Sequence, residues 1–437
     1  MRFQEVITSN GHILYSLPEE KYQFNSEKIL GMDLDWTIIK PIKGKIHPLD
    51  DKDWEFFSSK LSKIQDKINK GYKFVIFTNQ AGLLSGKINQ LNLDQFKSRW
   101  VDICHKLKTQ YSITSVYLIA SLYDDFNRKP CTGMWEFLET RLNGSVKVQR
   151  DKSLYIGDMA GRCATPNRLK DDISSFSGRK GDHSSSDLLF ALNLGVEFAV
   201  PEVFYDDSKE IGNRTKKLQE RVFADKEIFN GKKYLEEFDN NISRSNEKIT
   251  EEIKTLLLDK QKQFLIFFIG SPASGKSTYY ESYLAKVGLI YLSNDTFNGT
   301  PAKFNKEIDR NLKEGKNVIV DNTNASNKTR EKLIQIAKKN TAVDGSNIQV
   351  ICIYITTPKN IVMHLNALRT KITNRDVLNK VINEGHSVPV VAIHSYWKHL
   401  EEPDREKESI DYVFKIDYEP NFTKANGITK EQFSMLL

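Results

Sequence analysis

The chain has 437 residues, of which 39% are hydrophobic and 28% are charged, and its formal net charge is +7 at pH 7. This composition is typical of a globular protein and excludes a disordered or fibrous one, and the length favours two domains over a single core. No apolar run approaches the ~20 residues that span a membrane, and the start, MRFQEVITSN, lacks the features of a signal peptide. The mildly basic balance is compatible with a polyanionic partner but does not by itself indicate one.

The cysteines are scattered along the chain without the CxxC spacing of a zinc site, at Cys104, Cys131, Cys163 and Cys352. This pattern favours reduced thiols in a cytosolic or nuclear compartment and argues against zinc. Cysteine usage does not distinguish between those two compartments.

Strand-like apolar runs alternate with amphipathic helical stretches, which favours an α/β fold with parallel sheets. Strands are predicted at KFVIFTNQ and SLYIGD in the first half, and at QFLIFFIGSP, KNVIVDNTN and IQVICIYIT in the second. Each ends in polar residues, and open α/β sheets bind ligands where their parallel strands end. From about Asp206 to Gln263 the chain is strongly charged and poor in strand formers. We therefore predict domains at 1–230 and 231–437, with the boundary near residue 230.

The segment GMDLDWTIIK places Asp33 and Asp35 two residues apart at the end of an apolar run. Side chains alternate faces along a strand, so both carboxylates are expected on the same side. Two neighbouring carboxylates repel each other, and their burial is costly unless a cation or a proton holds them. The pair indicates a metal site, or a reaction that uses one ionised and one protonated acid. An Asp-rich turn after a strand is the alternative.

Three further segments extend this pattern: VIFTNQAG supplies Thr78, NRKPCTGMW supplies Lys129 and LYIGDMAGR supplies Asp158. With DLDWT they resemble, in order, the motifs of the haloacid dehalogenase (HAD) phosphotransferases. The resemblance implies that Asp33 attacks phosphorus to form an aspartyl phosphate, while Asp35 acts as general acid and then as general base. It also implies Mg²⁺ held by Asp33, Asp158 and the main-chain carbonyl of Asp35.

In the same resemblance, Thr78 and Lys129 would hold the phosphoryl oxygens as charge develops on them. Thr78 can instead be a strand-end hydroxyl that caps backbone, and Lys129 a solvated lysine. Arg128 is a weaker candidate for binding substrate phosphate. The intervals between Asp33, Thr78 and Lys129 leave no room for the large cap domain of many small-molecule phosphatases of this type. We therefore expect an open site that suits a macromolecular end.

The phosphatase half also contains GDMAGR followed by FSGRKGDHSSSDLLFALNLG, and the combination RKPCTGMWEFL. Both resemble the phosphatase domain of the eukaryotic polynucleotide kinase 3′-phosphatases. In that resemblance Asp182 and Asp187 are candidate supporting acids near the metal. They can equally be loop residues that cap the LLFALN helix.

The second half contains FFIGSPASGKSTYY, a G-x-x-x-x-G-K-[ST] motif between a predicted strand and a predicted helix. The glycines let backbone amides and the helix N-terminus face phosphate groups. Lys276 would bind the β and γ phosphates of ATP, and Ser277 would bind Mg²⁺. The residues predicted to bind the nucleotide here are Gly270, Ser274, Gly275, Lys276, Ser277 and Thr278. The motif alone does not separate a kinase from an ATPase or a GTPase.

YLSNDTF, at the end of the next predicted strand, resembles the segment of polynucleotide kinases that carries the general base, here Asp295. A helix N-cap aspartate is the alternative. The eukaryotic members usually have Arg before this Asp, whereas this chain has Asn294, which puts one contact to the acceptor end in question.

KNVIVDNTNASNKTR also resembles these kinases, although Asp321 can be a simple Walker B aspartate; both interpretations place it in the active cleft. NALRTKITNRD resembles the lid helix that puts arginines over the ATP phosphates. Arg369 and Arg375 match by spacing, and Thr373 stands where an intermediate lid Arg is expected. A solvated helix face is the alternative for both arginines.

The resemblance covers roughly residues 25 to 418 and has the domain order of the eukaryotic enzymes, phosphatase before kinase. The segment before Asp33 is too short for the N-terminal phosphopeptide-binding (FHA) domain of the animal members. The implied fold class is α/β, with an N-terminal HAD-type (Rossmann-like) phosphatase domain and a C-terminal P-loop kinase domain. The implied function is the removal of 3′-phosphates and the ATP-dependent phosphorylation of 5′-hydroxyls at DNA strand breaks.

The implied cofactors are Mg²⁺ and ATP, the implied partner is DNA with 3′-phosphate and 5′-hydroxyl ends, and the expected location is the nucleus. We expect a monomer without membrane association, and the sequence does not identify a partner ligase. The main alternative is an RNA end-healing enzyme with the same two activities. A scaffold protein with dead sites is disfavoured by the intact acids and the P-loop lysine. A small-molecule kinase fused to a metabolite phosphatase is disfavoured by the missing cap.

Overall fold

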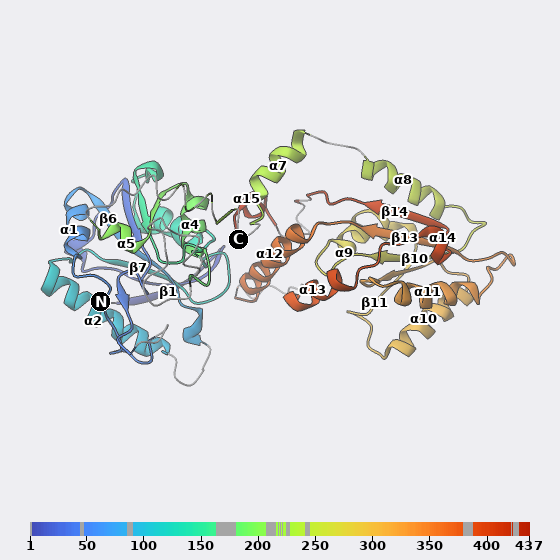
Figure 1. The fold of residues 1–437 in the computed structure, drawn as a ribbon, viewed down its shortest axis with the longest axis horizontal. Helices are drawn as coiled ribbons and strands as arrows, with labels where there is room; N and C mark the ends of the chain where they lie inside the picture. The colour runs from blue at the N-terminus through green and yellow to red at the C-terminus, as the bar shows by residue number, and fades with distance from the viewer. Residues whose placement is uncertain are drawn as a thin grey trace. The chain divides into compact units, whose positions relative to one another are not determined.

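The chain forms two compact units, each coloured by residue number in Figure 1. The computed structural model describes residues 2–43, 48–84, 91–162, 181–206, 216, 218, 220, 222–223, 228–240, 245–378, 388–420, 422 and 428–437. The first unit comprises Met1–Gly231, Arg369–Gly385 and Ser434–Leu437, and the second comprises Lys232–Leu368 and His386–Phe433. The main change of unit falls at Gly231, and two later segments group with the first unit.

The first unit is built on a seven-stranded sheet with the order β1-β2-β7-β6-β3-β8-β9. Its strands are β1 (Phe3–Thr8), β2 (Gly11–Ser16), β3 (Lys28–Met32), β6 (Tyr72–Asn79), β7 (Tyr117–Ser121), β8 (Leu154–Ile156) and β9 (Glu197–Ala199). Strands β7, β6, β3, β8 and β9 are parallel, and β1 and β2 add an antiparallel hairpin at one edge. A separate small ribbon pairs β4 (Ile39–Lys40) with β5 (Glu55–Phe56).

Both faces of this sheet are buried, as expected for parallel strands that read as continuous apolar runs. In β6, Phe74 and Ile76 belong to one core cluster, whereas Val75 and Phe77 belong to the cluster on the opposite face. The helices of the unit are α1 (Ser62–Asn69), α2 (Leu93–Tyr111), α3 (Gly133–Phe137), α4 (Ser186–Leu194) and α5 (Pro201–Phe204). Short helical turns are η1 (Glu20–Tyr22), η2 (Ala81–Leu84), η3 (Leu138–Leu142) and η4 (Arg150–Lys152). Trp100 of α2 packs in the first cluster, and the opposite cluster contains residues of α3 and α4.

The second unit is built on a five-stranded parallel sheet with the order β11-β12-β10-β13-β14. Its strands are β10 (Phe264–Ile269), β11 (Ile290–Ser293), β12 (Val318–Asp321), β13 (Gln349–Ile355) and β14 (Tyr412–Ile416). Its helices are α7 (Gly231–Asn240), α8 (Ser245–Leu257), α9 (Lys276–Tyr279), α10 (Pro301–Lys313), α11 (Asn327–Lys338), α13 (Val390–His399), α14 (Arg405–Glu408) and α15 (Lys430–Ser434). Helix α12 (Lys359–Leu378) begins in this unit, and its residues from Arg369 onward group with the first unit. Two helical turns, η6 (Tyr280–Leu284) and η7 (Ala285–Val287), follow α9.

The predicted α/β fold class is confirmed, and the five predicted strands correspond to β6, β8, β10, β12 and β13. Because parallel strands end at one edge of a sheet, the polar residues that follow them are brought together. In the first unit this edge carries the residues after β3, β6 and β8, and in the second the residues after β10, β11 and β12. None of the helices in the described ranges has the length and apolar character needed to cross a bilayer.

Candidate active sites

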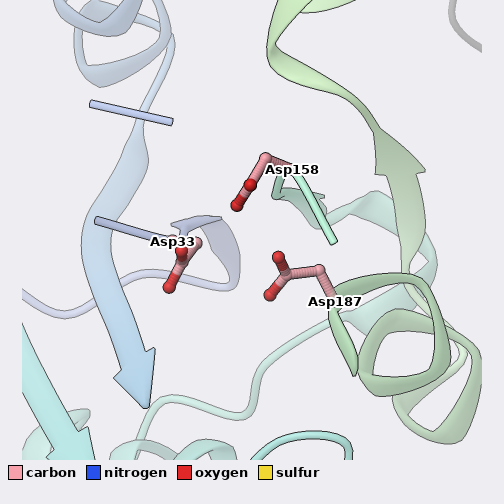
Figure 2. Close-up of side chains that lie close together, drawn as sticks. All are labelled: Asp33, Asp158 and Asp187. Atoms are coloured by element: carbon pink, nitrogen blue, oxygen red, sulfur yellow. The ribbon is translucent and has the colours of Figure 1, made fainter. Parts of the chain in front are cut away.

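Three buried carboxylates converge at the ends of the strands in the first unit. Asp33 follows β3, Asp158 follows β8 and Asp187 lies in the first turn of α4. Oxygen atoms of the three groups lie within 4.8 Å of one another, and Figure 2 shows the Asp158 and Asp187 carboxylates directed toward Asp33. An all-oxygen, acidic donor set is the type that Mg²⁺ prefers. The cluster therefore fits a magnesium ion, with Asp187 as a third carboxylate beside the predicted Asp33 and Asp158.

Gly157 explains how Asp187 comes so close to the end of β8. A Cβ atom at Gly157 would lie 2.4 Å from Asp187 Cγ, so any larger residue there would push the carboxylate away. The backbone amide of Met159 donates to Asp187 Oδ2 over 2.9 Å. Asp187 is thus both a residue of the helix start and a member of the acidic cluster.

Asp182, the other open candidate, makes different contacts. It accepts hydrogen bonds from the guanidinium of Arg162 and from the backbone amides of Ala160 and Arg162. Arg162 in turn donates to the backbone carbonyl of Asp158 over 2.9 Å. Asp182 therefore holds residues 160–162 in place after β8, and its carboxylate is occupied by Arg162.

Lys129 is buried between the carboxylates. Its Nζ lies 2.6 Å from Asp33 Oδ1 and 2.7 Å from Asp187 Oδ1, and it donates to the hydroxyl of Tyr155 over 2.8 Å. Burial alone would lower the pKa of Lys129, but Asp187 and Asp33 outweigh that effect and raise it, so the ammonium stays charged. Asn79 fixes the Lys129 backbone through two reciprocal hydrogen bonds, of 2.9 and 3.1 Å. Lys129 is therefore a held site residue rather than a solvated lysine.

Burial raises the pKa of Asp33 to about 7; Lys129 opposes the rise, and the negative charges of Asp187 and Asp35 add to it. A carboxylate in this setting needs further positive charge to be fully ionised at neutral pH. A divalent cation among Asp33, Asp158 and Asp187 would supply that charge. The electrostatics of the cluster thus agree with its geometry.

Asp35 is held in a separate set of contacts. Gln80 Nε2 donates to Asp35 Oδ2 over 2.8 Å and to Thr78 Oγ1 over 2.9 Å. Arg99 of α2 lies on the other side, with Nη1 3.4 Å from Asp35 Oδ1. Because Thr78 Oγ1 accepts from Gln80, its own hydrogen can be directed to another acceptor such as a phosphoryl oxygen. Gln80 thus couples the predicted acid–base residue to the predicted phosphate-binding hydroxyl.

Arg128, the weaker candidate for substrate phosphate, precedes Lys129 in the chain and is half-buried. Its Nε is 3.9 Å from Asp124 Oδ1, and its buried Nη1 has no hydrogen-bond partner. The guanidinium therefore retains donor capacity for a further acceptor.

In the second unit the P-loop connects β10 to α9. Ala273 has a φ of 60° and Gly275 a φ of 97°, so the loop curls into a cradle. A Cβ at Gly270 would lie 2.8 Å from Ser274 Oγ, which shows how tightly the loop closes on itself. The hydroxyls of Ser271 and Ser274 are buried without hydrogen-bond partners. Phosphate oxygens would supply the missing acceptors, so the loop fits a nucleoside triphosphate.

The first turn of α9 carries the remaining predicted nucleotide-binding residues. Lys276 Nζ donates to the carbonyls of Gly270 and Ser271, at 3.0 and 2.9 Å. Ser277 Oγ donates to Asp321 Oδ2 over 2.7 Å, and Thr278 follows it in the same helix. The contact between Ser277 and Asp321 is the pairing expected of residues that share a magnesium ion beside a P-loop.

Asp295 follows β11, next to the end of β12. The register pairs Ser293 with Asp321, so Asp295 lies two residues beyond the level of Asp321. The Asp295 side chain is exposed, so an acceptor hydroxyl could reach it. Asn294, where the related kinases usually have Arg, donates its backbone amide to Asn322 Oδ1 over 3.0 Å.

The two predicted lid arginines lie on the second half of α12. Arg369 is exposed, and Arg375 is half-buried and pairs with the carboxylate of Asp376 at 2.7 Å. The segment Arg369–Gly385 groups with the first unit rather than with the unit that carries the P-loop. The role of these two arginines over ATP therefore stays a prediction.

Several residues that support the two sites were not predicted from the sequence. Asn79 and Gln80 were visible in the TNQ segment but had no assigned role, and Arg99 and Tyr155 carried no motif. In the kinase unit, Tyr291 Oη donates to Asp321 Oδ2 over 2.5 Å. Burial raises the pKa of Tyr291, and the neighbouring Asp321 adds to the rise, so the hydroxyl stays protonated as a donor.

Comparison with known proteins agrees with both halves. The family described as polynucleotide kinase 3 phosphatase matches residues 28–205, and the AAA domain family matches residues 265–388. A protein of Acanthamoeba polyphaga mimivirus is 28% identical over 414 residues, which are 92% of this chain and 84% of that protein. The bifunctional polynucleotide phosphatase/kinase of Schizosaccharomyces pombe is 28% identical over 400 residues, 90% of this chain and 82% of that protein. The polynucleotide 3′-phosphatase of Saccharomyces cerevisiae is 29% identical over 223 residues, 40% of this chain and 87% of that protein.

The fold and the two sites define a two-domain phosphoryl-transfer enzyme, in which a HAD-type phosphatase unit carries the acidic cluster and a P-loop kinase unit carries the nucleotide cradle. The family matches and the relatives that extend over nine-tenths of the chain identify it more closely. The chain has a polynucleotide kinase 3 phosphatase domain followed by an AAA-family kinase domain, and over nine-tenths of its length it is similar to bifunctional polynucleotide phosphatase/kinases.

Proposed function

We propose that this enzyme removes 3′-phosphates and phosphorylates 5′-hydroxyls at DNA strand breaks, using Mg²⁺ and ATP. The observation that carries the proposal is the joining of Asp33, Asp158 and Asp187 around Lys129, in a chain that also has a P-loop. A break with a 3′-phosphate and a 5′-hydroxyl cannot be ligated. The two activities together convert it into a ligatable nick.

The residues of the first unit account for each step of dephosphorylation. Asp33 attacks phosphorus, and Asp35 donates its proton to the departing 3′-oxygen. Lys129 and the Thr78 hydroxyl hold the phosphoryl oxygens as negative charge develops. Asp35 then takes a proton from the water that hydrolyses the aspartyl phosphate. A magnesium ion held by Asp33, Asp158 and Asp187 would neutralise phosphate charge and keep Asp33 ionised.

The residues of the second unit account for phosphorylation of the 5′-hydroxyl. The P-loop amides and Lys276 bind the β and γ phosphates, while Ser277 and Asp321 would share the magnesium ion that accompanies ATP. Asp295 orients the acceptor hydroxyl and accepts its proton as the new P–O bond forms. Arg369 and Arg375 are proposed to contact the nucleotide phosphates.

The proposed substrate is a DNA end, because the described residues between Asp33 and Lys129 form only β4, β5, α1, β6, η2, α2 and β7, without a cap domain over the acidic cluster. The net charge of +7 agrees with a polyanionic partner. We propose a monomer that acts in the nucleus in DNA repair, upstream of a ligase. The relatives' names support polynucleotide ends and do not choose between DNA and RNA.

A competition between matched ends tests the choice of nucleic acid. DNA and RNA strands of one sequence, each with a labelled 3′-phosphate or a 5′-hydroxyl, would be offered together at fixed salt, since salt controls backbone affinity. We expect the kcat/KM for both activities to favour DNA. A preference for RNA at both ends would replace the repair assignment with RNA end healing.

A further inference from the structure

Arg99 is a buried cation beside the proposed acid–base residue. Its side chain is 1% exposed, and neither Nε nor Nη1 has a hydrogen-bond partner. The Nη1 atom lies 3.4 Å from Asp35 Oδ1, within ion-pair distance, and the guanidinium lies over the ring of Phe96 at 5.6 Å. Burying a guanidinium with unused donors costs free energy unless a nearby anion compensates for it. Asp35 is the anion on which this cation acts.

Each carboxylate oxygen of Asp35 has a different partner. Arg99 faces Oδ1, and Gln80 donates to Oδ2 over 2.8 Å. The hydrogen bond at Oδ2 and the ion pair at Oδ1 together restrain rotation of the carboxyl group about its Cβ–Cγ bond, and so restrain the direction in which it offers a proton. The Asp35 side chain is still 27% exposed, so it can reach a substrate oxygen.

We propose that Arg99 is a positioning residue of the phosphatase reaction, which acts through Asp35 and rests on the acid–base role given to Asp35 above. In the first step the Asp35 proton moves to the 3′-oxygen while the bond from that oxygen to phosphorus breaks. In the second step Asp35 takes a proton from water, whose oxygen bonds to phosphorus as the bond to Asp33 breaks. Arg99 keeps its own proton throughout and holds the carboxyl group in line for both transfers.

If Arg99 has this role, the effect of its loss should depend on how basic the leaving group is. A 3′-oxygen of a sugar is strongly basic and needs the proton of Asp35 when it departs. The p-nitrophenolate ion is weakly basic and departs without that proton. Loss of Arg99 should therefore slow phosphoenzyme formation from a 3′-phosphate but spare it with p-nitrophenyl phosphate. Hydrolysis of the phosphoenzyme, which needs Asp35 as base, should slow for both substrates.

The test uses the full chain with Arg99→Met, Arg99→Lys and the control Lys97→Met, which removes an α2 lysine that pairs with Glu5 at 3.5 Å. Steady-state kcat and KM would be measured with a 3′-phosphate DNA oligonucleotide, and the pre-steady-state burst of p-nitrophenolate with p-nitrophenyl phosphate. For Arg99→Met we expect kcat on the oligonucleotide to fall about 100-fold, the size of a misplaced catalytic group. We expect its KM to stay near that of wild type and its p-nitrophenolate burst to be retained before a slow steady state. Arg99→Lys should recover part of kcat, and Lys97→Met should match wild type.

Kinase activity on a 5′-hydroxyl and a melting curve would show that each variant is folded, and Arg99→Lys provides the measurement if Arg99→Met does not fold. A raised KM with unchanged kcat would overturn the proposal in favour of substrate binding by Arg99. If the p-nitrophenolate burst and oligonucleotide turnover were lost together, the proposal would be overturned, and Arg99 would instead maintain the structure of the whole site. The variant Asp33→Asn separates failure of the proposed phosphatase mechanism from failure of the role given to Arg99. If Asp33→Asn kept phosphatase activity, the proposed function would fall, and the role of Arg99 with it.

Discussion

Lys129 Nζ donates to Asp33 Oδ1 over 2.6 Å, so the predicted nucleophile is paired with a buried cation. The same ammonium contacts Asp187 at 2.7 Å. Lys129 therefore helps to hold the acidic cluster together and also lies where a phosphoryl group would bind. The Lys129 side chain thus contributes to both stability and catalysis, and removal of its charge should lower both.

The variant Lys129→Met tests that joint role. We expect phosphatase kcat to fall about 10²- to 10³-fold, because a donor to the developing charge is lost. The free energy of unfolding of the first unit should fall by about 3 kcal/mol, because buried carboxylates lose their cation. Phosphate release and urea denaturation would measure the two effects, with the exposed Lys152→Met as control. A variant with wild-type activity would show that Lys129 is structural only.

Asp187 and Asp182 should behave differently when each is changed to asparagine. Asp187→Asn removes a carboxylate from the cluster, so the Mg²⁺ concentration for half-maximal phosphatase activity should rise about 10- to 100-fold or more. Asp182→Asn weakens the pairing with Arg162, so it should lower the melting temperature more than it changes the Mg²⁺ requirement. A Mg²⁺ titration of both variants measures the difference. Equal Mg²⁺ requirements would remove Asp187 from the metal site.

Tyr291 should matter to the kinase alone. Its hydroxyl donates to Asp321 Oδ2 over 2.5 Å, on the same carboxylate oxygen that Ser277 contacts. A hydrogen bond to a charged group contributes about 1.5 kcal/mol, so Tyr291→Phe should lower kinase kcat about 10-fold. Phosphatase activity should be unchanged. The exposed Tyr283→Phe serves as control, and equal kinase rates in the two variants would contradict the expectation.

His364 predicts a pH dependence of stability in the second unit. Its ring is buried against Phe433, 2.9 Å from the Phe433 carbonyl, and burial lowers the pKa of His364 from 6.5 to about 4. Since the unfolded chain binds the proton more readily, the free energy of unfolding should be highest above pH 6.5. It should fall by at most about 1.4 kcal/mol per pH unit between there and about pH 4.

Melting curves from pH 7 to pH 5 measure this dependence. His364→Gln should show a shallower loss of melting temperature than wild type on acidification, because glutamine does not titrate. The exposed His394→Gln should follow wild type. The same slope in all three proteins would exclude His364 as the group responsible.

The strands and site residues that lie in short motifs could be predicted from the sequence. Contacts between segments that are distant in the chain could not. The apolar runs that end in Asp33, Thr78 and Asp158 become parallel strands of one sheet, because continuous burial and polar ends are local features. The place of Asp187 was left open between a metal role and a helix cap. Only the fold shows that Gly157 admits its carboxylate to the cluster.

Arg99 could not be predicted, because nothing in the pattern of α2 distinguishes a charged residue that faces the core from one that faces solvent. The α2 helix has a capping box at Asn92 and Gln95, so its start is encoded locally. Which of its charged residues meets Asp35 depends on how the helix packs on the sheet. The grouping of Arg369–Gly385 with the first unit is likewise a tertiary outcome that a lid motif does not encode.

The most direct test of two separate active sites uses one gapped DNA duplex that carries both a 3′-phosphate and a 5′-hydroxyl, incubated with Mg²⁺ and ATP. Wild type would be compared with Asp35→Asn and Lys276→Ala, and both ends of every product would be read on a sequencing gel. We expect Asp35→Asn to lose only 3′-dephosphorylation and Lys276→Ala to lose only 5′-phosphorylation. Loss of both activities in either variant, or of neither, would contradict two independent phosphoryl-transfer sites.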